Sequence, residues 1–218
     1  SIALLLVAII GAVSNVNAQQ KMITKNTLNK QEQSIIAISS LTAKGDLVKL
    51  KTELNNGLEA GLTINEIKEI LVHTYAYSGF PRSIRGLQTF MQVLDERKAK
   101  GINDTTGNDA SAIEETGSKY ERGKKILSEL TKTPAPDKLT GYSAFAPVMD
   151  SFLKEHLFAD IFERDVLNYV QRELVTISVI ATIGNAEPML RSHLNICLNV
   201  GLTPEQLQQF VSVIKSTI

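Results

Sequence analysis

Residues 193–207, HLNICLNVGLTPEQL, have an earlier counterpart in residues 53–67, ELNNGLEAGLTINEI, and six of the fifteen aligned positions are identical. The shared Gly-Leu-Thr step predicts the end of one helix and the start of the next. Gly61 and Gly201 can take the positive φ that ends a helix, and the threonine two residues later can cap the helix that follows. The two stretches therefore predict two copies of one helical hairpin.

The repeat extends beyond the hairpin. Residues 34–38 align with residues 173–177, and Gly45 aligns with Gly184, with one residue inserted before the later hairpin. Elsewhere apolar residues recur at spacings of three and four, and the alternation typical of strands is scarce. We therefore expect an all-α fold, with helices at residues 28–44, 47–60, 64–78, 81–98, 115–131, 145–158, 167–183, 188–200 and 204–217.

The composition is that of an ordinary globular chain. Its 218 residues carry 23 basic and 23 acidic side chains, so charge favours neither nucleic acid nor an anionic membrane as a partner. A hydrophobic content of 43% is enough to form a core. Residues 101–114 are rich in Gly, Asn, Asp and Thr, which favours a flexible linker between a first repeat at residues 19–100 and a second at 115–218.

The first eighteen residues are typical of a secretory signal peptide that lacks its own beginning. Residues 2–13 form an uninterrupted apolar run, and residues 16–18 resemble a small-x-small cleavage site. This run is shorter than the roughly 20 residues that span a bilayer. The mature protein would begin near Gln19, be periplasmic or secreted, and carry no membrane segment. A transmembrane anchor or a buried core helix is the alternative.

Cys197 is the only cysteine in the sequence. A single cysteine excludes an intramolecular disulfide, a paired-cysteine redox centre and a cysteine-based zinc site. Cys197 follows His193 by four residues, which places both on one helical face, so His193 could activate a thiolate there. The alternative is that Cys197 is a small hydrophobic residue of the core.

Function should show where two copies of one scaffold have diverged. Three such differences pair Glu173 with Ser34, His193 with Glu53, and His73 with Val213. A carboxylate bonded to one imidazole nitrogen fixes the tautomer and raises the pKa of the other nitrogen, which makes a general acid/base. Glu173 and His193 are therefore a candidate pair. The alternatives are a core histidine bonded to a backbone carbonyl and a glutamate that caps its helix or forms a salt bridge.

His73 is the first residue of an aromatic segment at the end of a predicted helix. Tyr75, Tyr77 and Phe80 follow it, and Pro81 closes the segment. These side chains are either the wall of a pocket or ordinary packing with hydroxyl groups that reach the surface.

Taken in order, these motifs resemble the carboxymuconolactone decarboxylase family, which includes the alkylhydroperoxidases. The resemblance rests on residues 70–81, 120–124, 158–167, 172–177 and 193–207. It implies an alkylhydroperoxidase-like helical bundle, built here from two related helical-hairpin repeats, that commonly forms homo-oligomers and holds active sites in clefts between helices. The alkylhydroperoxidase branch has a Cys-x-x-Cys pair before its histidine, and residues 185–192 contain no cysteine.

The resemblance also implies roles for individual residues. Glu173 and His193 match the acid/base pair of the family, Arg164 matches an arginine before that helix, and His73 matches the histidine of the closing motif. Neither copy holds the full set, which implies one composite site made by both halves. The chain stops about a helix short of the family's usual end, which implies truncation at both termini.

The activity implied is decarboxylation of a small carboxylated lactone or oxo acid, with no metal or organic cofactor. Arg164 would bind the anion, His193 held by Glu173 would protonate the enolate, and His73, Tyr77 and Cys197 would contact the substrate. The alternatives are a secreted small-molecule-binding protein without turnover and a peroxide-reactive protein that uses Cys197.

Overall fold

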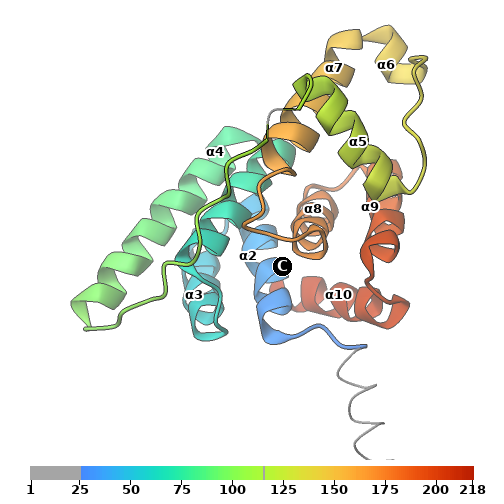
Figure 1. The fold of residues 1–218 in the computed structure, drawn as a ribbon. Helices are drawn as coiled ribbons and strands as arrows, with labels where there is room; N and C mark the ends of the chain where they lie inside the picture. The colour runs from blue at the N-terminus through green and yellow to red at the C-terminus, as the bar shows by residue number, and fades with distance from the viewer. Residues whose placement is uncertain (1–25, 115) are drawn as a thin grey trace, which may run out of the picture.

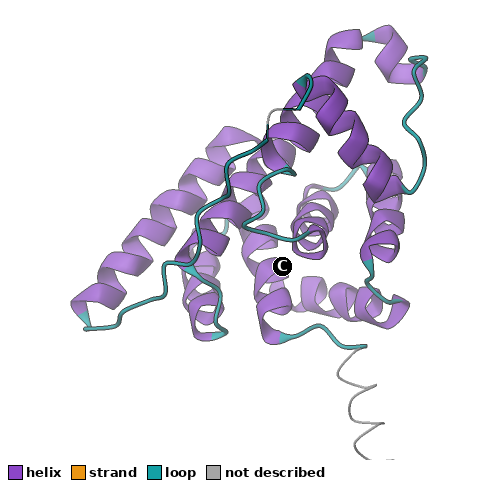
Figure 2. Ribbon diagram, in the orientation of Figure 1, coloured by secondary structure: helices purple, strands orange, loops and turns teal. Residues whose placement is uncertain are grey.

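The computed structural model describes residues 26–114 and 116–218, and every regular element in these ranges is a helix (Figure 1, Figure 2). The elements are α2 (Lys30–Lys44), α3 (Leu47–Glu59), α4 (Ile64–Ala99), α5 (Lys119–Thr131), α6 (Gly141–Phe145), α7 (Pro147–Ser151), the π-helix η1 (Phe152–Ile161), α8 (Tyr169–Ile183), α9 (Glu187–Val200) and α10 (Pro204–Thr217). The all-α prediction is confirmed. The predicted signal peptide lies outside the described residues.

The helix starts repeat between the two halves. Asn29 caps α2 and Asn168 caps α8, and each forms a capping box with the residue three positions on. Thr63 and Thr203 do the same for α4 and α10. Gly61 and Gly201, which precede these threonines, both have positive φ values, 94° and 111°. The Gly-Leu-Thr step therefore ends one helix and starts the next in both halves, as the sequence repeat predicts.

The two halves pack across each other. In the centre α2 lies against α8, with α3 on α2 and α9 on α8 (Figure 1). The third helix of each half reaches the central helix of the other half, since α4 packs on α8 and α10 packs on α2. The longer helix α4 also packs on α2 and α3 of its own half. One hydrophobic core runs through both halves, from Leu28 and Ile35 to Leu174 and Phe210.

Helix α4 is made of two helical stretches joined at a kink, in agreement with the prediction of two helices at residues 64–78 and 81–98. The helical stretch continues to Ala99, but Gly79 breaks it with φ 80° and ψ 165°. Only glycine adopts this conformation readily, and Pro81 supplies no backbone N–H to the turn before it. The break therefore fixes the direction of the chain just after Tyr77.

A second layer covers one end of this bundle. Here α5 packs on η1, and a separate hydrophobic cluster forms between them and Ile196 of α9. A Cβ atom added to Gly123 of α5 would lie 1.7 Å from the Lys154 carbonyl oxygen, so only glycine permits this approach. The predicted helix at residues 145–158 corresponds to α7 followed directly by η1, and the short helix α6 precedes it.

Residues 101–114 run along the start of α4. The carbonyls of Thr105 and Thr106 accept hydrogen bonds from the Ile64 and Asn65 amides, which have no partner within the helix. The Asn65 side chain donates to the backbone of this segment at Gly107 and Asn108. Residues 105–108 of the segment predicted to be flexible are thus hydrogen-bonded to the first half, whereas the Ser111 amide donates to Asp165 of the second half at 2.8 Å.

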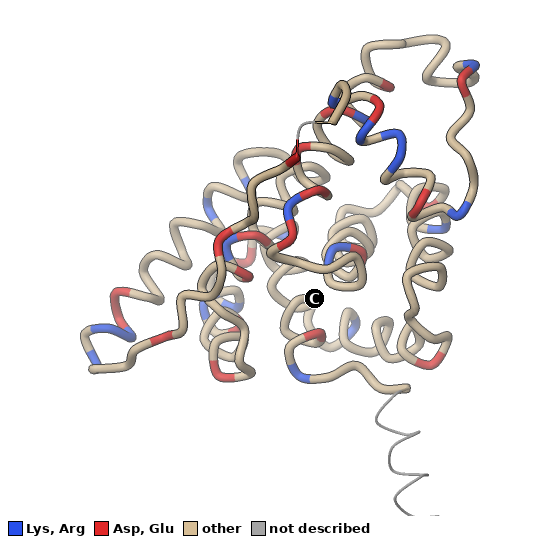
Figure 3. Tube along the Cα trace, in the orientation of Figure 1, with Lys and Arg blue, Asp and Glu red and all other residues tan. Residues whose placement is uncertain are grey.

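Charged side chains of both signs are interspersed along the chain, in keeping with its zero formal net charge (Figure 3). Within the part of the chain that the structure describes, no helix is long and apolar enough to cross a membrane.

Candidate active site

A cavity of about 590 Å³ lies between the bundle and the layer made by α5, α7 and η1. Most of its wall is apolar, and includes Leu153, Leu157, Phe158, Ile180 and Ile196. Tyr77 of α4 and Ser192 and His193 of α9 supply polar groups to the same wall. An apolar cavity with a few convergent polar groups is the usual form of a small-molecule site.

The candidate acid/base pair is in contact. His193 Nδ1 lies 2.9 Å from Glu173 Oε2, across the hairpin of α8 and α9. The Glu173 side chain is fully buried, whereas that of His193 is 13% exposed. Because Nδ1 is bonded to Glu173, the other ring nitrogen, Nε2, is left for a ligand in the cavity that His193 lines.

Burial raises the pKa of Glu173, and the hydrogen bond from His193 offsets this only in part. The second carboxyl oxygen, Oε1, is one of two buried side-chain atoms without a hydrogen-bond partner among the described residues. No partner stabilises a negative charge on Oε1, so burial favours the protonated form of the Glu173 carboxyl group, which can donate to His193 Nδ1. In that state Nε2 of His193 carries a proton and can act as an acid.

His73 belongs to a buried hydrogen-bond chain that ends at Tyr77. Arg172 Nη1 lies 3.0 Å from His73 Nδ1, and His73 Nε2 lies 2.9 Å from Thr176 Oγ1. Thr176 Oγ1 in turn donates to Tyr77 Oη at 3.1 Å. Burial, with the charge of Arg172 second, holds the pKa of His73 well below its usual range, so the ring is neutral.

The hydrogen bonds of this buried series all run in one direction, with each donor on the Arg172 side and each acceptor on the Tyr77 side. A guanidinium group can only donate, so His73 accepts at Nδ1 and carries its proton on Nε2. The Thr176 hydroxyl oxygen accepts a hydrogen bond from His73 Nε2–H, and the hydroxyl group donates a hydrogen bond to Tyr77 Oη. The Tyr77 hydroxyl, already an acceptor, is left to donate to a group in the cavity that Tyr77 lines. Burial and the charge of Glu173 raise the pKa of Tyr77, which keeps its proton in place.

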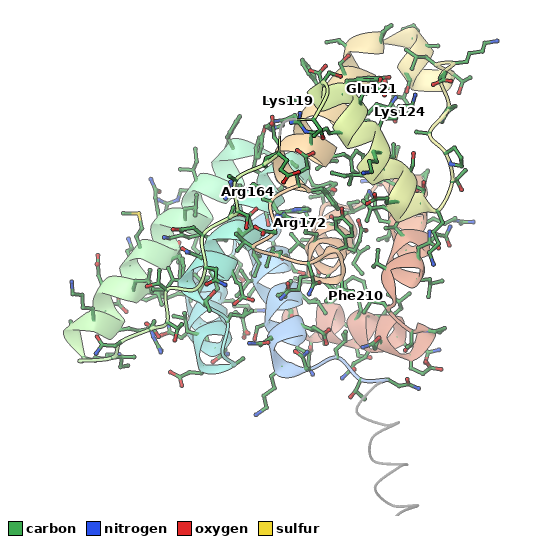
Figure 4. The ribbon with its side chains drawn as sticks, viewed as in Figure 1. Lys119, Glu121, Lys124, Arg164, Arg172 and Phe210 are labelled. Carbon is green, nitrogen blue, oxygen red and sulfur yellow. The ribbon has the colours of Figure 1, made fainter. Side chains whose placement is uncertain are left out.

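Arg164 lies elsewhere. Its guanidinium forms two hydrogen bonds to Glu69 through Nε, at 2.9 and 3.1 Å, and one through Nη2 at 3.0 Å. Glu69 also accepts from Arg172 at 2.8 Å, and Figure 4 shows the two labelled arginines close together. Arg164 is not among the residues that line the cavity. The structure thus brings this predicted anion binder to an internal carboxylate and not to the polar groups of the cavity.

Cys197 is fully buried in the main core and is also absent from the cavity wall. Burial and then the charge of Glu173 raise the pKa of its thiol far above the usual range. A thiol in this environment is neither exposed nor ionised, so the structure separates Cys197 from the other predicted site residues.

Sequence reasoning did not single out Glu69, Arg172 or Thr176. The sequence feature that could have indicated them is a spacing of four residues. Glu69, His73 and Tyr77 follow this spacing on one face of α4. Arg172 and Thr176 follow it on the side of α8 that faces α4. Polar residues at this spacing between apolar ones indicate a buried polar seam. Within residues 26–114 and 116–218, no group of three or more His, Cys, Asp or Glu side chains is placed to hold a metal ion.

Comparison with known families matches residues 14–90 and 147–217 to the Carboxymuconolactone decarboxylase family. These two regions make up more than half of the chain, and they contain both members of the acid/base pair and the polar residues of α4. The chain therefore belongs to the Carboxymuconolactone decarboxylase family, and the match in two regions fits a tandem repeat.

Two curated proteins are similar to part of the chain, and one of them is a named decarboxylase. The 4-carboxymuconolactone decarboxylase of Acinetobacter baylyi is 28% identical over 94 residues, which is 43% of this chain and 69% of the relative. An uncharacterised protein of Methanocaldococcus jannaschii is 24% identical over 81 residues, 37% of this chain and 76% of the relative.

Proposed function

We propose that this protein is a decarboxylase that acts on a small carboxylated lactone or oxo acid by acid/base chemistry without a cofactor. The observation that carries the proposal is the 2.9 Å contact between Glu173 and His193 at the wall of a mostly apolar cavity. The second support is the Tyr77 hydroxyl, which the hydrogen-bond chain through Thr176 leaves as a donor into the same cavity. Family membership and the similarity to a named decarboxylase agree with this chemistry.

The reaction follows from these groups. The bond between the substrate carbon and its carboxylate breaks, carbon dioxide leaves, and the electron pair moves into the conjugated carbonyl. Tyr77 donates a hydrogen bond to the resulting enolate oxygen. His193 then delivers the proton on Nε2 to the carbon, and Glu173 stabilises the remaining proton on the imidazole. One proton taken from water restores the pair, so the balance is one proton consumed for each carbon dioxide released.

The apolar wall of the cavity favours a reaction in which the substrate loses the charge of its carboxylate. A carboxylate held against Leu157, Phe158 and Ile196 has little solvation, and its departure as neutral carbon dioxide removes that cost. This arrangement needs no cation in contact with the leaving group. Lys154, which also lines the cavity, is bonded to Asp150 at 2.7 and 2.8 Å.

The test is carbon dioxide release from a panel of carboxylated lactones and oxo acids, corrected for the spontaneous reaction. His193→Ala should lower kcat by about 10²–10⁴, the usual contribution of a positioned acid/base group. Ser212→Ala, which removes an exposed hydroxyl group of α10 outside the cavity, is the control and should stay near wild-type turnover. Wild-type turnover in His193→Ala would sink the proposal. Binding of the panel without carbon dioxide release would instead support a binding protein of the same family.

The peroxide-reactive alternative has a separate test. Because Cys197 is buried and its pKa is raised, the folded protein treated with hydrogen peroxide should keep its full thiol titre, measured after unfolding. Cys197→Ser should keep the decarboxylase turnover. Stoichiometric loss of the thiol in the folded protein would restore the single-cysteine peroxide mechanism.

A further inference from the structure

A second cavity, of about 610 Å³, lies between α2, α3 and α10. These helices are the repeat counterparts of α8, α9 and the first part of α4, which hold the proposed active site. The first and third helices of the two sets begin with the same capping boxes, and each third helix contacts the central helix of the other half. The second cavity is therefore in the position that corresponds to the active site.

The walls of the two cavities coincide position by position. When the repeats are aligned, seven residues of the second cavity match seven residues of the first: Leu41 with Ile180, Lys49 with Met189, Thr52 with Ser192, Glu53 with His193, Asn56 with Ile196, Ser216 with Ala76, and Thr217 with Tyr77. The two cavities therefore occupy equivalent positions in the two repeats.

The chemistry of the two copies differs. Three apolar wall positions of the active site, Met189, Ile196 and Ala76, are polar in the second cavity. The position of the buried Glu173 is taken by Ser34, which also lines the second cavity. The position of His193, which Glu173 contacts in the first cavity, is occupied in the second cavity by the carboxylate Glu53. The second cavity therefore has no acid/base pair and a more polar wall.

Glu53 is the group in this cavity best placed to recognise a charge. It is half-buried, and its carboxylate accepts one hydrogen bond, from Asn56 Nδ2 at 3.2 Å. No ion pair of Glu53 is found within the described residues. Lys30 and Lys49, which line the same cavity, are exposed. Glu59, the other carboxylate of the lining, is also exposed and pairs with Arg97, and Lys49 Nζ donates to the Thr217 carbonyl at 3.2 Å. Glu53 is thus the most buried of these charged residues and has no cationic partner among the described residues.

We propose that the second cavity binds a small zwitterion, a molecule with an ammonium group and a carboxylate a few bonds apart. The ammonium group pairs with Glu53, and the carboxylate lies toward Lys30 and Lys49. Hydroxyl and amide groups of Ser34, Asn56 and Thr217 offer further hydrogen bonds to the same ligand.

The experiment is a titration of the full chain, labelled for NMR, with glycine, β-alanine and 4-aminobutyrate. Saturable shifts of the resonances of α2, α3 and the end of α10 are expected, and the resonances around His193 should stay in place. Butylamine and butyrate, which carry one charge each, should bind more weakly than 4-aminobutyrate. A cavity that recognises only one charge would bind one of these two as well as it binds the zwitterion, and this would overturn the proposal.

Three variants make the test specific. Glu53→Gln should weaken binding roughly tenfold or more, because a charge-assisted hydrogen bond is lost while the shape is kept. Lys49→Gln should weaken 4-aminobutyrate but not butylamine. His193→Ala should change neither, which separates this site from the proposed active site. Unchanged affinity in Glu53→Gln, or no saturable shift with any of the amino acids, would overturn the proposal and leave the decarboxylase proposal untouched.

Discussion

Thr176 is the residue through which the buried chain reaches the cavity. It accepts from His73 and donates to Tyr77, and both bonds use one hydroxyl group. We predict that Thr176→Val, which keeps the shape but removes the hydroxyl, lowers kcat on the order of tenfold, less than loss of the Tyr77 donor itself would. KM should change little, because the change acts on an interaction that forms with the enolate.

The control is Thr176→Ser, which keeps the hydroxyl and should restore most of kcat. Measuring kcat and KM separately for wild type and both variants distinguishes orientation of Tyr77 from general damage. Equal losses in the Val and Ser variants would show that packing of the methyl group, and not the hydrogen-bond chain, is what matters.

Glu173 couples the site to folding stability. Its pKa is raised by burial, so between the usual pKa and the raised one the folded protein holds a proton that the unfolded chain has released. This stabilisation is complete below the usual pKa of glutamate and is lost as pH rises through the raised pKa.

We therefore predict that the free energy of unfolding of Glu173→Gln rises relative to wild type when pH is raised from about 4 to about 8. Urea denaturation at several pH values measures the difference, and circular dichroism confirms that both proteins are folded. A difference that is constant over this range, or that falls with pH, would contradict the raised pKa.

At this scale the sequence predicts the acid/base pair but not its surroundings. Glu173 and His193 were found because the two repeats differ there, and the structure places them in contact. Arg164 was assigned from its place in a motif, yet a motif does not show that Glu69, far away in the sequence, takes up its guanidinium. Partners across helices depend on the packing of α4 on α8, which no local pattern contains.

At the scale of elements, the break in α4 positions the hydroxyl donor of the cavity. Gly79 has φ 80° and ψ 165°, two residues after Tyr77, and a Cβ atom there would meet nothing closer than Pro81 Cδ at 3.6 Å. The cost of a side chain is therefore backbone strain and not a clash.

We predict that Gly79→Ala lowers the free energy of unfolding by about 1–3 kcal/mol and also lowers kcat, because relief of the strain moves Tyr77. Gly101→Ala is the matched control, since Gly101 also has positive φ and open space around it but lies far along the chain from the site. It should lose stability without losing kcat. Equal kcat values in the two variants would contradict the role given to the break.

Most helices could be predicted because their ends carry local signals, such as the capping boxes at Thr63 and Thr203. The regions that differ lack such signals. A π-helix such as η1 has the composition of an α-helix, and its wider turn is set by what it packs against. The close approach of Lys154 to Gly123 belongs to that packing and is visible only in three dimensions.

At the scale of the whole molecule, each half supplies a helix that the other half needs. We predict that a chain divided after Ala112 gives two fragments, neither of which unfolds cooperatively alone, because the core holds residues of both. An equimolar mixture should regain helical circular dichroism and a cooperative thermal transition. Cooperative unfolding of either fragment by itself would contradict the shared core.

The exchange of α4 and α10 between the halves also bears on how such a protein can change over generations. Two copies of a one-repeat ancestor could exchange their third helices in the same way as a two-fold dimer, and each inherited substitution would then appear in both sites at once. Joining the copies in one gene removes that constraint. The aligned positions of the two sites can then hold different residues, as His193 and Glu53 do, because a change in one copy is no longer repeated in the other.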